Sequence, residues 1–120
     1  MRRGERNAVA PATLTVKDAL LVMTRAKSGS VAVVDRRGRL VGVFTDGDLR
    51  RHMAADEHIL TRTLKDVMTP KPIHIREDAL AVEALRIFNH RNIDDLIVIN
   101  AAREPVGLVD SQDLPKLKLM

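Results

Sequence analysis

An internal repeat constrains the fold of this chain more than any other feature of its sequence. Residues 18–49 align without a gap with residues 83–114, as the segments DALLVMTRAKSGSVAVVDRRGRLVGVFTDGDL and EALRIFNHRNIDDLIVINAAREPVGLVDSQDL show. The offset between the two copies is the separation of Gly42 from Gly107. Most apolar positions of one copy meet an apolar residue in the other, such as Val43 with Leu108. Self-similarity of this kind indicates one supersecondary unit written twice.

Each copy has the pattern of a helix, two strands and a second helix. Apolar residues recur at helical spacing over residues 16–23 and again over residues 80–88. Two short apolar runs follow in each copy, and a second helix is predicted to begin at Thr45 or at its counterpart Asp110. The predicted strands are residues 31–34 and 40–44, then 96–99 and 106–109, with a short extended piece before each first helix at residues 8–10 and 73–75.

The repeat also predicts the domain organisation. We expect residues 1–58 to form the first repeat, with a shortened N-terminal strand, residues 59–72 a connector, and residues 73–120 the second repeat. Pro70 and Pro72 end any helix in the connector and favour extended backbone after it. Neither copy alone has enough apolar surface for a stable core. The predicted fold class is therefore α/β (α+β), with two β-α-β-β-α repeats packed about a pseudo-twofold axis and the functional site in the cleft between them.

Composition argues against several classes of function. The formal charge is +4 and the sequence pI is near 10, but the basic residues are dispersed and there are only two aromatic residues, so a nucleic-acid interface is not expected. No apolar run is long enough for a membrane span, and no secretory signal is recognisable. The absence of cysteine and the scattered histidines predict no metal site. No motif brings a nucleophile and a base together, so we expect no catalytic residues. The absence of cysteine fits a cytoplasmic protein.

Thr45 and Asp48 have the spacing of a helix capping box. In that motif the threonine hydroxyl accepts an early helical N–H, and the acidic side chain accepts the N–H of the cap residue. Aspartate caps a helix equally well, so Asp110 and Asp113 satisfy the same need in the second copy. Capping alone therefore explains both stretches.

The same stretch also suits a phosphorylated ligand. A helix N-terminus offers free N–H groups and positive potential to a phosphate. The hydroxyl of Thr45 could join those donors, while Asp48 could accept hydrogen bonds from sugar hydroxyls. Gly47 would let a ligand approach the backbone closely, and Arg50 and Arg51 add positive charge nearby.

The pattern glycine, apolar, apolar, Ser/Thr, any, any, Asp/Asn, together with the duplication, resembles a tandem CBS pair, or Bateman module. The stretch from Gly42 to Asp48 fits it fully, whereas Asp110 departs from it in the second copy. More narrowly, VGVFTDGDLRR, DVMTPKPIHI and AVEALRIFNHRNID are similar to the C-terminal half of arabinose-5-phosphate isomerases. The resemblance implies a regulatory part of a sugar-phosphate isomerase of lipopolysaccharide (Kdo) synthesis, without the catalytic SIS domain that precedes the CBS pair in that family.

The resemblance also implies which residues bind a ligand. The first site would use Thr45, Asp46, Gly47 and Asp48 for phosphate and ribose, with the base between the backbone segments at Val9, Ala10, Ser30 and Val31. A second, weaker site would use Ile75, Asp95, Leu96, Asp110 and Asp113. Asp110 would repel a phosphate, so one competent anion site is expected.

The identity of the ligand stays open at this point. An adenine nucleotide (AMP, ADP or ATP) and a pathway product such as CMP-Kdo are both compatible with the resemblance. CBS pairs commonly associate through their helices, so a homodimer is expected. The alternative is a purely structural oligomerisation module that binds no small molecule.

Overall fold

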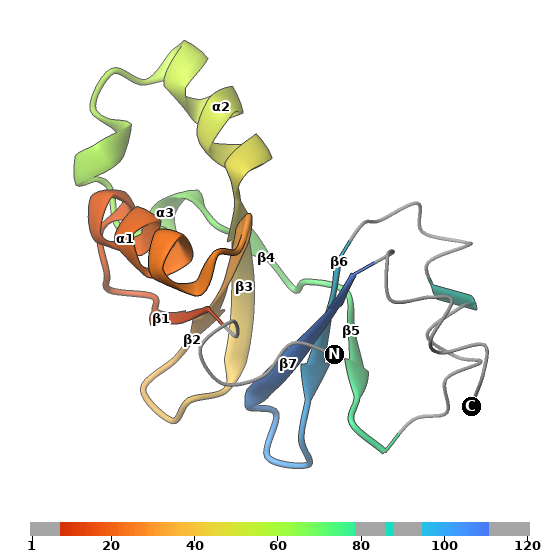
Figure 1. Ribbon diagram of the computed structural model, residues 1–120. Helices are drawn as coiled ribbons and strands as arrows, with labels where there is room; N and C mark the ends of the chain where they lie inside the picture. Colours follow the sequence, from red (N-terminus) through yellow and green to blue (C-terminus); the bar gives the residue numbers. More distant parts are fainter. Residues whose placement is uncertain (1–7, 79–85, 88–94, 111–120) are drawn as a thin grey trace.

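The computed structural model of the protein describes residues 8–78, 86–87 and 95–110. In this part of the chain a mixed α+β fold is built from two small sheets, with helices beside the first of them (Figure 1). The elements are β1 (Val9–Pro11), α1 (Val16–Ala26), β2 (Ser30–Val34), β3 (Leu40–Thr45), α2 (Asp46–Ala55), the 3-10 turn η2 (Ile59–Thr61), α3 (Leu64–Val67), β4 (Thr69–Pro70), β5 (His74–Arg76), β6 (Asp95–Ile99) and β7 (Pro105–Asp110).

The two sheets repeat each other in topology and in register. The first has the strand order β1-β2-β3-β4 and the second the order β5-β6-β7. Val33 pairs with Gly42, and Val98 pairs with Gly107, so the offset that relates the two sequences also relates the two ladders. Even the irregularity after Val33 recurs after Val98. The predicted repeat of two short strands preceded by an extended piece is therefore confirmed. The structure adds that the extended piece, β1 or β5, pairs parallel to the first of the two strands.

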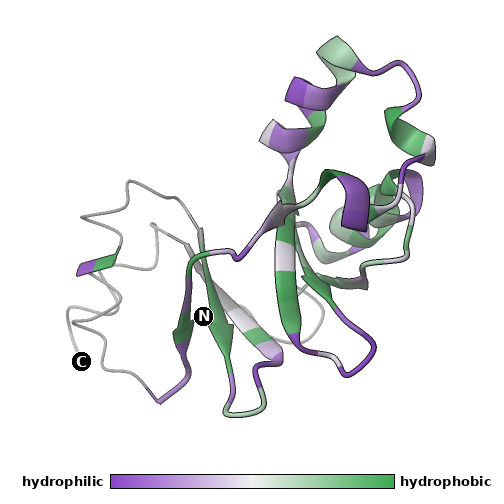
Figure 2. Ribbon diagram, turned by 180° about the vertical axis from the view of Figure 1, so that it is seen from behind, coloured by the Kyte–Doolittle hydropathy of each residue, from purple (hydrophilic) through white to green (hydrophobic). Residues whose placement is uncertain are grey.

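The core of the first unit lies between its sheet and α1. Thr15 caps the helix through a hydrogen bond from Asp18 N, and the buried face of α1 carries Val16, Ala19 and Met23, as the helical spacing predicts. These side chains pack on the buried residues of the strands, including the fully buried Phe44. Figure 2 shows the resulting separation of hydrophobic and hydrophilic residues along the ribbon.

The predicted connector packs on the first unit. Ile59 and Leu64 are buried in its core, and β4 pairs with β3 as the fourth strand of its sheet. Backbone hydrogen bonds from Val16 N to Arg62 O and from Leu64 N to Leu14 O fasten the connector to the start of α1. The stretch is thus held at a fixed position by the first unit.

A second apolar cluster joins the two sheets. Ala32 and Leu40 of the first sheet and Ile97 and Ile99 of the second are buried together, with Val9 and Val43 packed against them. The hairpin turns of the two units also meet, because Leu40 N donates to Arg103 O at 2.8 Å. The expected packing of one sheet on the other is observed.

Two expected helices cannot be compared with the structure. Most of the helix predicted at residues 80–88 and all of the residues after Asp110 lie outside the described part of the chain. Of the helices that are described, none is long and apolar enough to span a membrane.

Candidate functional site

The N-terminus of α2 carries the predicted capping box. Thr45 has extended backbone, and its Oγ1 accepts a hydrogen bond from Asp48 N at 3.1 Å. In return, Asp48 Oδ2 accepts the Thr45 N–H at 3.0 Å. Both bonds of the motif are present, so the structural interpretation of the Thr45 and Asp48 spacing is confirmed.

Asp48 is a buried carboxylate with both oxygens engaged. Asp48 is only 5% exposed, and its Oδ1 accepts a hydrogen bond from Arg51 Nη2. Arg51 lies one turn later on the same helix, and its side chain is 72% exposed. The ion pair therefore joins a buried anion to a cation that reaches it from solvent.

Two donors remain available at this helix start. Thr45 Oγ1 accepts one hydrogen bond and makes no other among the described residues, so its own hydrogen is free to donate. Asp46 N donates to Gly29 O and Asp48 N to Thr45, which leaves the Gly47 N–H as the first-turn donor without an assigned acceptor in the described part of the chain. These donors and the guanidinium of Arg51 favour an anion at this position.

The start of β2 lies beside the same helix end. Ser30 is buried and pairs with Thr45 in the β2–β3 ladder. A Cβ on Gly29 would lie 3.2 Å from Asp46 Oδ2, so the turn before β2 is in close contact with α2. The structure therefore brings Ser30, Thr45, Asp46, Gly47 and Asp48 together, as the sequence predicts.

The other residues predicted for this site contribute differently. Ala10 and Val31 bury their side chains in the core beneath α1, so that only their backbone could meet a ligand. Val9 faces the cluster between the sheets. Ala8 O accepts a hydrogen bond from Ala32 N, which ties the start of β1 to β2.

The second predicted site repeats this backbone arrangement with different chemistry. Asp95 and Asp110 are direct partners in the β6–β7 ladder, at the positions of Ser30 and Thr45 in the first unit. Two acidic residues thus occupy the ladder positions where the first unit has two hydroxyl-bearing residues. Leu96 is fully buried and Ile75 half-buried. Asp113 lies outside the described residues.

Sequence reasoning missed two contacts at the first site. The contact of Gly29 with Asp46 depends on the tertiary arrangement of the turn before β2, for which the only signal is a glycine between two serines. The pairing of Arg51 with Asp48 was available from their spacing of three residues on one helix.

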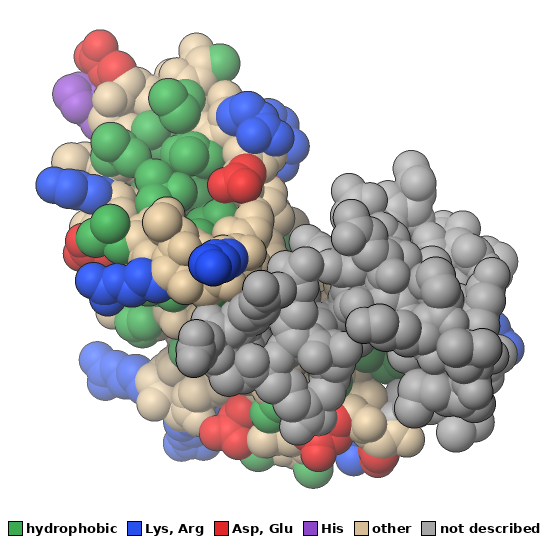
Figure 3. Space-filling view, viewed as in Figure 1, with side chains coloured by type: hydrophobic (Ala, Val, Ile, Leu, Met, Phe, Trp, Pro, Cys, Tyr) green, Lys and Arg blue, Asp and Glu red, His purple; other side chains and the backbone are tan. Residues whose placement is uncertain are grey.

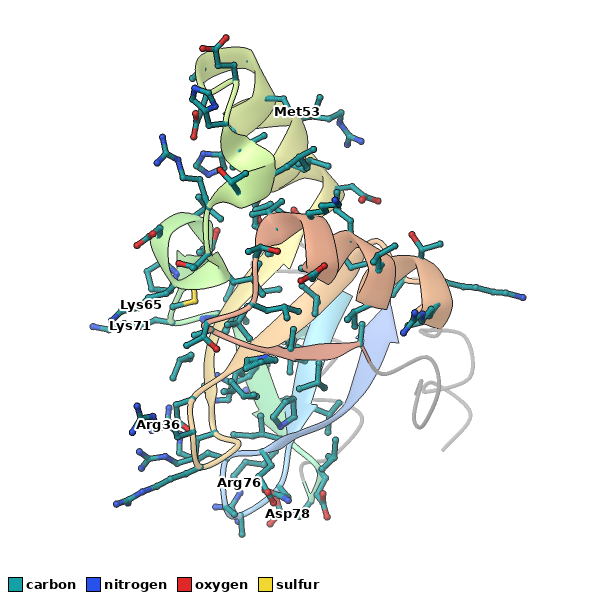
Figure 4. The ribbon with its side chains drawn as sticks, turned by 90° about the vertical axis from the view of Figure 1, so that its left-hand side faces the viewer. Arg36, Met53, Lys65, Lys71, Arg76 and Asp78 are labelled. Carbon is teal, nitrogen blue, oxygen red and sulfur yellow. The ribbon has the colours of Figure 1, made fainter. Side chains whose placement is uncertain are left out.

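Other features of the described surface lie away from this site. An open hollow at the far end of α2 is lined by Met53, Ala54, Ala55, Asp56, Glu57 and His58; Figure 4 labels Met53 on that helix. Next to it, the side-chain hydrogen bond from Arg62 holds the pKa of Asp56 below its ordinary value. At the β2–β3 turn, hydrogen bonds from Arg39 and Arg37 lower the pKa of Asp35. Among the described residues no group of His, Asp and Glu side chains could hold a metal ion.

Both halves of the chain match the same known protein family. A family model described as CBS domain matches residues 5–55 and 64–117. The arabinose 5-phosphate isomerase KdsD of Pseudomonas aeruginosa is 39% identical over 102 residues, and KdsD of Escherichia coli K12 is 37% identical over 102 residues. Each match covers 85% of this chain and 31% of the isomerase, so the chain spans less than a third of the length of these relatives.

Solved structures agree on the fold. CBSX2 in complex with AMP superposes with a TM-score of 0.79 at 24% identity, covering 99% of this chain and 92% of that one. The CBS domain pair of protein MJ0100, in complex with 5′-methylthioadenosine and S-adenosyl-L-methionine, gives a TM-score of 0.80 at 23% identity, covering 97% and 90%. At these identities the likeness is one of fold.

Proposed function

Because the chain belongs to the CBS domain family and carries a tandem pair of its repeats, we propose that it is a regulatory module that binds a phosphate-bearing nucleotide at the N-terminus of α2. The observation that supports this proposal is that donors for a phosphate and an acceptor for a sugar lie together at one helix N-terminus. The hydroxyl of Thr45, the Gly47 N–H and the guanidinium of Arg51 are donors for a phosphate. Asp48, one turn on, is a buried acceptor for the hydroxyls of a sugar.

The two ends of a nucleotide have matching requirements. Its phosphate needs hydrogen-bond donors and positive charge, and its ribose needs an acceptor. The backbone segments at Val9 and Ser30 would flank the base. An adenine nucleotide is the first candidate, because two solved CBS proteins of similar fold hold adenosine compounds. CMP-Kdo is the second, because the resemblance to isomerases of Kdo synthesis would make it a feedback effector.

We propose that the chain performs no isomerisation of its own and regulates a sugar-phosphate isomerase domain. It matches only 31% of the KdsD length, and the family resemblance assigns the chemistry to the SIS domain. A ligand that favours one arrangement of the two repeats would bias the attached domain by population shift. The apolar cluster between the sheets is the contact through which such a change would pass.

An apolar surface favours self-association as a second candidate function. Leu21, Met53 and Leu60 are exposed on α1, α2 and η2, and Figure 3 shows hydrophobic side chains gathered on the face between α1 and α2. Burying such a patch against a second copy would produce the expected homodimer. Under this alternative hypothesis, the module would hold isomerase subunits together without binding a small molecule.

A ligand screen on the isolated chain separates these candidates. A nucleotide that binds only the folded state must raise the melting temperature, and calorimetry with AMP, ADP, ATP and CMP-Kdo then gives the affinity. The Thr45→Asp variant keeps the helix cap but removes the free donor and adds a negative charge. We expect an unchanged melting temperature without ligand and a loss of affinity of about tenfold or more.

Thr45→Ser is the matched control, because serine keeps both the cap and the hydroxyl donor. Its affinity should stay close to that of the parent chain. Equal affinity of the Thr45→Asp variant would contradict binding at this helix. An absence of heat with every nucleotide, from a chain that is dimeric by light scattering, would favour the structural role.

A further inference from the structure

A buried serine at the start of β2 has a side-chain hydroxyl without a partner. Ser30 is only 6% exposed, and its backbone N–H and C=O are both bonded to the hydroxyl of Ser28. Ser30 Oγ itself makes no hydrogen bond in the part of the chain that the structure describes. None of the described side-chain oxygens is both fully enclosed and unpartnered, so this hydroxyl remains in contact with solvent. A ligand that arrives from solvent can therefore reach it.

The alternation of side chains along β2 shows on which face of the sheet this hydroxyl lies. Val31 is buried in the core beneath α1, whereas Ala32 belongs to the cluster between the two sheets. Because successive side chains of a strand point to opposite faces, Ser30 lies on the same face as Ala32. Its direct ladder partner, Thr45, shares that face. Both hydroxyls are thus on one face, at the end of the strands where α2 begins (Figure 1).

The two hydroxyl-bearing residues form a close pair of the ladder. Asp46 N donates to Gly29 O at 3.0 Å, and this bond flanks the pair of Ser30 and Thr45. The backbone groups of a pair flanked in this way do not bond each other, and its side chains lie closer together than those of a hydrogen-bonded pair. The Cβ atoms of directly opposite residues are about 4.5–5.5 Å apart. Both hydroxyls can therefore reach the same group of a ligand.

Other donors lie beside this pair. Thr45 Oγ1 accepts from Asp48 N and keeps its own hydrogen to donate. A Cβ on Gly47 would lie 3.6 Å from Thr45 Oγ1 and 3.5 Å from Arg51 Nη1, so the first turn of α2 is close to both groups. A phosphate has several acceptor oxygens and can use hydroxyls, an N–H and a guanidinium at once. We propose that the Ser30 hydroxyl donates to the phosphate of the ligand, beside the hydroxyl of Thr45.

This role rests on the proposed nucleotide site and adds a side chain to it. Ser30 lies outside the stretch from Gly42 to Asp48 that fits the family pattern. Because Asp48 is the acceptor for the sugar and lies on the same helix turn, the bound phosphate is the one next to the sugar. That phosphate is terminal only in a nucleoside monophosphate, where it offers more free oxygens than a phosphodiester does. A second hydroxyl donor therefore favours a monophosphate over ATP or CMP-Kdo.

Ser30→Ala removes only this hydroxyl. Since the hydroxyl has no hydrogen-bond partner among the described residues, the melting temperature without ligand should be unchanged or higher. The affinity for AMP or CMP, whichever binds more tightly to the parent chain, should fall about tenfold or more in calorimetry. The affinity for the corresponding nucleoside, adenosine or cytidine, should not change, because the nucleoside has no phosphate. Titration followed by NMR measures the weaker nucleoside binding.

Ser28→Ala is the matched control. Its hydroxyl is already bonded to the backbone of Ser30 within the same turn. Loss of these bonds should lower the melting temperature and leave the affinity for the monophosphate nearly unchanged. An equal loss of affinity in both variants would show that the turn, and not the Ser30 hydroxyl, supports binding.

The outcomes separate the role of Ser30 from the proposed function. If Ser30→Ala keeps its affinity while Thr45→Asp loses it, the role of Ser30 is refuted and the nucleotide site stands. Equal losses for the monophosphate and the nucleoside in Ser30→Ala would place the hydroxyl at the sugar or the base, which also overturns a phosphate contact. Should no nucleotide bind, and should inorganic phosphate leave the amide signals of Ser30 and Gly47 unmoved, the role of Ser30 and the proposed function both fail.

Discussion

Replacement of Gly47 by alanine should move stability and ligand binding in opposite directions. Gly47 is the second residue of α2 and does not have positive φ. An added Cβ would lie 3.5 Å from Arg51 Nη1 and 3.6 Å from Thr45 Oγ1, which is ordinary van der Waals contact. The fold therefore accepts alanine, and the higher helix propensity should raise the free energy of unfolding by about 0.5–1 kcal/mol. For a domain of this size the melting temperature should rise by about 3 °C.

The same methyl group would occupy the space that the proposed phosphate needs. It would be in van der Waals contact with both Thr45 Oγ1 and Arg51 Nη1, two of the proposed phosphate donors. We expect the affinity for the best nucleotide of the screen to fall about tenfold or more, which corresponds to about 1.4 kcal/mol. Titration calorimetry at constant salt measures the affinity, and thermal unfolding without ligand measures the stability.

Ala54→Gly, at the other end of the same helix, is the matched control. It should lower stability by a similar amount and leave the affinity unchanged, which would show that binding does not simply follow stability. An unchanged affinity of the Gly47→Ala variant would refute the placement of a phosphate over the first turn of α2. A lower melting temperature would instead refute the view that glycine is dispensable for the fold.

Three other perturbations test the edge strand, the surface charges and the asymmetry of the repeats. Gly42→Ala should lower the free energy of unfolding, measured in urea, by about 1–3 kcal/mol because the new methyl group meets Met68. The loss should be smaller when Met68 is also replaced by alanine. Asp56→Asn should lower the melting temperature at neutral pH. Arg62 lowers the pKa of Asp56, so this stabilisation is present above the ordinary pKa and is lost as the pH falls through the lowered value. The melting temperatures of the variant and the parent chain should therefore converge at acidic pH, below the lowered pKa. Calorimetry should find one nucleotide per chain, and Asp110→Thr should permit a second; a second site in the parent chain would contradict the role given to Asp110.

The repeat made the fold of the first unit predictable in detail. One constant offset relates the apolar runs and the glycines of the two copies. The same offset relates the strand registers of the two sheets, including the irregularity after Val33. The capping box was also predictable, since its two hydrogen bonds depend only on residues three apart on one helix. Both features are local or periodic, which is the kind of information that a single sequence contains.

The features that could not be predicted depend on tertiary contacts. The segment at residues 59–72 reads as a connector because prolines interrupt it, yet Ile59 and Leu64 complete the core of the first unit. Likewise Val9 and Ala10 both belong to a short apolar strand, but only the packed structure shows that Ala10 faces the core beneath α1 while Val9 faces the other sheet. Successive side chains of a strand point to opposite faces of the sheet, but the sequence of a short strand does not reveal which layer covers each face.

Capping and ligand binding draw on the same atoms at the start of α2, and this overlap bears on how tightly a nucleotide could bind. Asp48 already accepts from Thr45 N and from Arg51, so a ribose must share or displace one of these donors. Arg51 is the exposed member of the pair, but Asp48 is buried, so a ribose hydroxyl has to replace the guanidinium as the donor to Asp48 Oδ1. That exchange would free the guanidinium to turn toward the phosphate, while Thr45 Oγ1 still caps the helix by accepting from Asp48 N.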